Sequence, residues 1–263
     1  MHLIRSLWAY RGFILGSVKR EFQNKYQNSM LGALWNVLNP LAMIVVYTVI
    51  FTQLMRAKLP GIDSSFGYSI YLCAGVLTWG LFADITNRSQ NSFLDNANLL
   101  KKINFPRLCL PVIVILNALL NFAIVFGLFT VFLVISGSFP GWAYISLLPL
   151  LSLVIIFAVG LGMVLGVLNV FFRDVGQAFG IFISFWFWLT PIVYPINILP
   201  KVGQDLMMYN PLAPLLGAIQ NVLVQGLWPS WVNLIYPSLL GLILCMLGWR
   251  LFKKYSGEMV DEL

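Results

Sequence analysis

This chain has few of the chemical groups that most enzymes use. Its only histidine is His2, and only 10% of its 263 residues are charged. It has no G-x-x-x-x-G-K-[ST] phosphate-binding loop, no zinc-ligand spacing and no paired carboxylates within its apolar stretches. We therefore expect a protein that is not an enzyme, with no catalytic residue, no metal site and no cofactor of its own.

Cysteine is equally scarce. Cys73, Cys109 and Cys245 are an odd number, lie in different apolar stretches and form no C-x-x-C pair. This pattern is typical of small buried residues, and it argues against a disulfide framework or a metal cluster.

Apolar residues are abundant: 60% of the chain is hydrophobic and the mean hydropathy is +0.87. A helix needs about 20 apolar residues to cross a bilayer, because lipid offers the backbone no hydrogen-bond partners. We predict an all-α integral membrane protein with six transmembrane helices. The six predicted spans are about 37–55, 67–86, 109–135, 143–169, 177–196 and 232–251.

The same pattern predicts one transmembrane domain over residues 1–263. Residues 1–36 would be a cytoplasmic interface helix and entry segment, 37–251 the six-span bundle, and 252–263 a cytoplasmic tail. Basic residues set the orientation, because they concentrate on the cytoplasmic side of membrane proteins. With the N-terminus inside, only Arg56, Lys58 and Lys201 fall outside, so both termini should be cytoplasmic. Topology and anionic lipid head groups then account for the net charge of +7, and no nucleic-acid partner is needed.

Two cytoplasmic segments have distinctive patterns. Residues 3–23 are predicted to form an amphipathic helix on the inner leaflet, although a plain lead-in to the first span is the alternative. In residues 96–107, Asn98 would cap a short helix that Pro106 stops. Apolar Leu99 and Phe105 beside Lys101 and Lys102 suit docking to a cytoplasmic partner, and a solvated basic loop is the other interpretation.

The stretch from Pro191 to Ser230 predicts short helices on the outer side, before the last span. Asn210 followed by Pro211 is a helix start, and the helix ends near Gln225 because Gly226 follows. Some 15 residues rise only about 22 Å, so this helix is re-entrant or interfacial.

Charged and small residues within the spans have structural interpretations. Asp84 precedes Arg88 by four residues, which predicts an ion pair on one helix rather than the ion ligand of a secondary transporter. Gly162 and Gly166 form a G-x-x-x-G pattern, which we interpret as close helix packing rather than a dimer face.

Several uncharged polar and aromatic residues are candidates for a substrate pathway, where flat rings would contact sugars without binding them tightly. For Asn117 and Asn121, helix-to-helix hydrogen bonds are the main alternative. For the aromatic residues, the alternatives are a lipid-facing belt or the protein core. The candidates are Tyr47, Phe51, Asn117, Asn121, Trp186, Trp188 and Tyr194.

Several motifs over residues 15–255 together resemble the type-2 ABC exporter permeases, and most closely the polysaccharide and O-antigen export branch. They are Lys25-Tyr26-Gln27-Asn28-Ser29-Met30-Leu31-Gly32 with Leu34-Trp35 and Asn39-Pro40, the segment Asn98 to Arg107 with Pro111, Arg173-Asp174, Pro191 to Pro195, and Asn210-Pro211.

The resemblance implies a homodimer in the bacterial inner membrane with two copies of a separate ATP-binding cassette subunit, which would hold the ATP and Mg²⁺. It implies a lipid-linked polysaccharide such as O-antigen as cargo, moved outward; capsules, teichoic acids and drugs are cargoes of the wider family. It also implies that one cytoplasmic segment couples to the ATPase. The coupling candidates are Asn98, Leu99, Lys101, Lys102, Phe105, Pro106 and Arg107.

Overall fold

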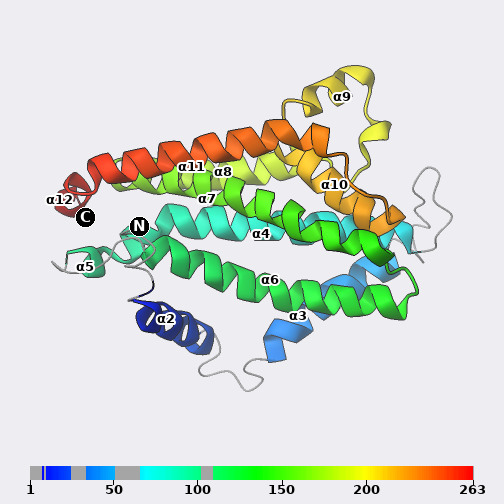
Figure 1. Cartoon of the computed structure of the whole chain (residues 1–263), viewed down its shortest axis with the longest axis horizontal. Helices are drawn as coiled ribbons and strands as arrows, with labels where there is room; N and C mark the ends of the chain where they lie inside the picture. Colours follow the sequence, from blue (N-terminus) through cyan, green and yellow to red (C-terminus); the bar gives the residue numbers. More distant parts are fainter. Residues whose placement is uncertain (1–7, 9, 25–33, 51–65, 102–108, 263) are drawn as a thin grey trace.

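The computed structural model of the chain describes residues 8, 10–24, 34–50, 66–101 and 109–262. Throughout these residues the regular structure is helical and no strand occurs, so the all-α expectation is confirmed. Figure 1 shows the long helices side by side, with shorter helices at both ends of the bundle.

Four helices in the described part are long and apolar enough to cross a membrane. They are α4 (Gly67–Asp95), α6 (Cys109–Ile135), α7 (Leu147–Phe171) with the 3-10 helix η3 (Gly141–Ser146) before it, and α11 (Ile235–Tyr255) with η5 (Trp231–Leu234) before it. The third predicted span, 109–135, has the bounds of α6. The long apolar helices establish a membrane-embedded protein.

Two other predicted spans differ from the helices that are observed. Helix α8 (Asp174–Leu189) stops well before residue 196, because Pro191 cannot continue a helix and restricts the residue before it. Its 16 residues rise about 24 Å, less than the roughly 30 Å of a hydrocarbon core. Helix α3 (Trp35–Thr48) is described for 14 residues, and predicted positions 51–55 of its span lie outside the described residues.

The ends of the bundle carry different helices. At one end lie α2 (Arg11–Asn24), α5 (Ala97–Leu100) and the C-terminal α12 (Glu258–Glu262), and we call this the α5 end. At the other lie α9 (Lys201–Met207) and α10 (Leu212–Gln225), and we call this the α10 end (Figure 1).

Helix α10 ends at Gln225 as predicted, and it begins at Leu212, one residue later than the predicted first helical position Pro211. The Asn210 side-chain oxygen accepts a hydrogen bond from the Leu212 N–H at 3.1 Å, so it satisfies a donor of the first turn. Gly226 follows the last residue with φ of 65°, a left-handed conformation that residues with a Cβ rarely adopt.

Small residues bring α4 and α7 close together. A Cβ on Gly162 would lie 2.5 Å from the Cβ of Ser89, and one on Gly166 would lie 2.8 Å from the Ser89 carbonyl oxygen. The G-x-x-x-G pattern therefore serves packing within the chain, as predicted.

Candidate functional site

The predicted coupling segment begins where α4 ends. Helix α4 continues to Asp95, nine residues beyond the predicted span, and α5 follows it at once. Leu100 is buried among Phe93 and Phe252, whereas Asn98 and Lys101 are exposed. The segment thus has an apolar side held by the bundle and a polar side directed outward. Lys102, Phe105, Pro106 and Arg107 lie outside the described residues.

The prediction that Asn98 caps this helix is wrong. Helix α5 begins at Ala97, so Asn98 is its second residue. Asn96 occupies the break between α4 and α5, and its side-chain amide donates to the Ser92 carbonyl oxygen at 2.9 Å. Asn96 thus satisfies the end of α4, and no side-chain hydrogen bond caps α5.

Helix α2 is anchored to the long helices by a polar cluster. The Glu21 carboxylate accepts hydrogen bonds from the Arg88 guanidinium and from the Asn117 amide. Arg88 also donates to Asp84 at 2.7 Å, which confirms the predicted i, i+4 pair. Asn117 therefore makes a helix-to-helix hydrogen bond, which was the main alternative to a role in the substrate pathway.

In the predicted amphipathic helix, Trp8, Leu15 and Val18 were expected to share the apolar face, but only Val18 of these three is buried. Ile14 and Val18 of α2 pack on Cys109 and Ile113 of α6, while Trp8 and Leu15 are exposed. The apolar residues thus divide between the bundle and the outside. Residues 3–7 of the prediction lie outside the described residues.

A buried amide cluster joins α4, α7 and the start of α8. The Asn169 side chain is 2% exposed; its amide nitrogen donates to the Gln90 carbonyl at 3.1 Å and to the Asn91 side chain at 3.2 Å. Its oxygen accepts from the Gly176 N–H at 2.9 Å, and the Gln90 amide donates to the Gly176 carbonyl at 3.3 Å. The turn between α7 and α8 is therefore fixed to the part of α4 that leads to α5. This cluster was not predicted. Its one signal in the sequence is Asn169, an amide within the apolar run before Arg173-Asp174.

The aromatic pathway candidates lie in different surroundings. The Trp186 ring packs edge-on against Trp79 and Phe82, and its indole nitrogen donates to the Asn210 side chain at 3.1 Å. Trp188 is exposed, and its carbonyl oxygen accepts from the Tyr194 hydroxyl at 2.8 Å.

The remaining candidates do not join this group. Tyr47 is half-buried against the main core, and Asn121 is half-buried on α6. Asn117 contacts α2 at the α5 end, whereas Trp186 contacts Asn210 beside α10. Phe51 lies outside the described residues. The structure thus joins Trp188 to Tyr194, places Trp186 against the core, and leaves the pathway role of all the candidates as a prediction.

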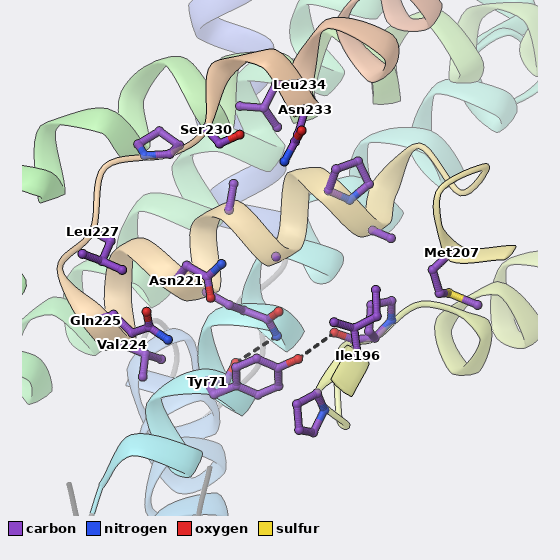
Figure 2. A pocket seen from close by; sticks show the side chains of 18 of the residues that line it. Tyr71, Ile196, Met207, Asn221, Val224, Gln225, Leu227, Ser230, Asn233 and Leu234 are labelled. Carbon is purple, nitrogen blue, oxygen red and sulfur yellow. Dashed lines mark hydrogen bonds between the residues drawn. The ribbon is translucent and has the colours of Figure 1, made fainter. Parts of the chain in front are cut away.

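The segment from Pro191 to Pro195 is held firmly against α4 and α10. The Tyr68 hydroxyl donates to the Val193 carbonyl at 2.6 Å, and the Tyr71 hydroxyl lies 3.1 Å from the Pro191 carbonyl oxygen. The buried Gln220 amide donates to the carbonyl oxygens of Tyr71 and Ile192, both at 3.2 Å. A cavity of about 830 Å³ opens beside this network (Figure 2).

Metal-ligating side chains do not cluster in the described residues, and the cysteines lie apart. Among the described residues, no group of three or more histidine, cysteine or acidic side chains could hold a metal ion. The three cysteines are free and separate.

Comparisons with known proteins identify the family of this chain. Residues 14–224 match the ABC-2 type transporter family. An O-antigen export system permease protein, RfbA of Klebsiella pneumoniae, is 31% identical over 93% of this chain and 92% of its own length. RfbA of Myxococcus xanthus is 28% identical over the full length of both chains, and the polysialic acid transport protein KpsM of Escherichia coli is 24% identical over 92% of this chain and 93% of its own. The chain belongs to the ABC-2 type transporter family.

Proposed function

We propose that this chain is the membrane-spanning permease subunit of an ATP-driven exporter, and that it moves a lipid-linked polysaccharide such as O-antigen outward across the bacterial inner membrane. The observation that carries the proposal is the full-length similarity to two proteins named O-antigen export permeases, at 28–31% identity. The more distant similarity to a polysialic acid transport protein favours a capsular polysaccharide as the second candidate cargo.

The proposed topology has six spans with both termini in the cytoplasm, within one transmembrane domain. Helices α3 and α8 supply the two spans beyond the four long ones, since both are apolar. The α5 end is then cytoplasmic, with α2 on the inner leaflet, and α9 and α10 are short outer helices. The exposed cations of the last turn of α11, Lys253 and Lys254, agree with this orientation.

The proposed working unit is a homodimer of this chain with two copies of a separate ATP-binding cassette subunit, which holds ATP and Mg²⁺. Segment 98–107 contacts that subunit. Movement of the subunit during ATP hydrolysis is transmitted to the bundle through Leu100 and the end of α4. The cargo passes weakly binding aromatic and amide residues, because tight binding at any point would stall a long polymer.

Replacing Arg107 by glutamate tests the coupling role. We expect the rate of ATP hydrolysis that depends on cargo to fall about tenfold, within the usual range of coupling between sites, because the charge at the ATPase contact is reversed. The measurement is ATP hydrolysis and polysaccharide export by the reconstituted complex.

The matched control is Lys201→Glu, the same charge change on exposed α9 at the α10 end. It should leave both rates unchanged. Normal hydrolysis and export with Arg107→Glu would remove Arg107 from the coupling segment.

A further inference from the structure

The cavity at the α10 end has walls of defined shape. The described residues that line it come from α4, from the segment after α8, from the end of α9, from α10, and from the connection between α10 and α11 with the start of α11. Figure 2 shows Tyr71 on one wall and Asn221 and Gln225 on α10. Because the hydrogen bonds of Tyr71 and Gln220 hold this wall, the cavity is formed before any ligand enters.

Its size is that of a binding site for a small molecule or for a short part of a polymer. Such sites have volumes of about 300–1,000 Å³ and combine apolar walls with a few polar groups. At about 830 Å³ this cavity falls within that range, and its apolar walls include Pro214, Val224 and Leu227.

The polar groups of the lining are neutral. Among the described residues that line the cavity, none is an aspartate, glutamate, lysine or arginine. Lys201 and Asp205 of the neighbouring α9 are exposed and do not line it. Neutral groups are present instead, in the side chains of Asn197, Asn221, Gln225, Ser230 and Asn233.

These side chains suit the hydroxyl groups of sugars. An amide donates through its nitrogen and accepts through its oxygen, and a sugar hydroxyl does both as well. Asn221 and Gln225 lie four residues apart, so they share one face of α10 and reach the same ligand. The exposed rings of Trp228 and Tyr236 add π-faces, whose negative charge density attracts the C–H groups of a sugar ring.

An acidic sugar would bind less tightly in this cavity. A carboxylate is bound best by arginine or lysine, through charge-assisted hydrogen bonds. In this cavity it would lose part of its hydration without meeting a cation from the described lining.

We propose that this cavity binds a short, uncharged stretch of glycan at the outer mouth of the transporter, so that the cargo is a neutral rather than an acidic polysaccharide. The proposal rests on the proposed function, which makes a polysaccharide the cargo. It adds the place where the polysaccharide is bound and the absence of charge on the bound stretch.

The test is a titration of the purified full-length chain in lipid nanodiscs with two probes of equal length. One is maltohexaose, an uncharged hexasaccharide, and the other is a hexamer of sialic acid. We expect maltohexaose to bind about tenfold more tightly, because only it matches the neutral lining. The readout is tryptophan fluorescence, supported by calorimetry.

Three variants locate the binding. Asn221→Leu with Gln225→Leu should weaken maltohexaose about tenfold, since two hydrogen bonds are lost. Gln177→Leu, an exposed amide of α8 outside the cavity, should change nothing. Asn221→Lys should tighten the sialic acid hexamer, because it supplies the missing cation.

Equal or tighter binding of the acidic hexamer to the unmodified chain would overturn the proposal. So would unaltered maltohexaose binding by the double variant, or no binding of either probe. Assembly with an ATP-binding cassette subunit and ATP-driven export, measured on the same preparations, test the proposed function separately. Export without neutral glycan binding would reject only the inference drawn from the cavity.

Discussion

Replacement of Asn169 by leucine is expected to destabilise the protein and to impair export. Leucine fills a similar volume but removes three hydrogen bonds, those to the Gln90 carbonyl, the Asn91 side chain and the Gly176 N–H. Leaving buried polar groups without partners should lower the free energy of unfolding by about 1–3 kcal/mol. Thermal unfolding of the purified chain measures this loss.

The variant should also slow export in reconstituted vesicles, because the turn before α8 then keeps its hydrogen bond from the Gln90 amide but loses those made through Asn169. The control is Gln177→Leu, which makes the same kind of change at an exposed position one residue after Gly176. If Asn169→Leu unfolds at the same temperature as the Gln177 variant, the amide cluster does not hold these helices together.

Replacement of Gly162 by alanine is expected to force α4 and α7 apart. The new Cβ would lie 2.5 Å from the Ser89 Cβ and 3.0 Å from its hydroxyl oxygen, closer than packed atoms approach. Overpacking of this kind costs about 1–3 kcal/mol, and here it falls on a helix pair at the centre of the bundle. The yield of folded protein and its unfolding temperature should both drop.

Two further variants distinguish overpacking at Gly162 from destabilisation by any glycine-to-alanine replacement in these helices. Gly127→Ala on α6 meets no atom within 4 Å and should not destabilise, since alanine favours a helix more than glycine does. Ser89→Gly combined with Gly162→Ala removes the clashing atoms and should restore much of the stability. If the double variant is as unstable as Gly162→Ala alone, the contact between α4 and α7 is not the cause of the lost stability.

Local patterns in the sequence predicted local features well. The bounds of α6, the end of α10 at Gln225 and the Asp84–Arg88 pair were predicted, and the start of α10 was predicted to within one residue. Each depends on residues within a few positions of one another, where hydropathy, capping and helical spacing act directly.

Features that depend on distant partners were not predicted. The second span was predicted to end near residue 86, whereas α4 continues through the polar residues that follow to Asp95. Ser89 and Gln90 are buried there because α7 supplies small residues and the Asn169 amide, some 80 positions further along the chain. Trp186 likewise has a core partner, Trp79, that its own segment does not reveal.

We propose that this chain performs no work by itself and depends on ATP hydrolysis by a partner. The direct measurement is the movement of a lipid-linked polysaccharide across vesicles that hold either the purified chain alone or the chain with its ATP-binding cassette subunit. We expect movement only when both subunits and ATP are present. Movement of the polysaccharide by the chain alone, against a concentration gradient, would contradict it.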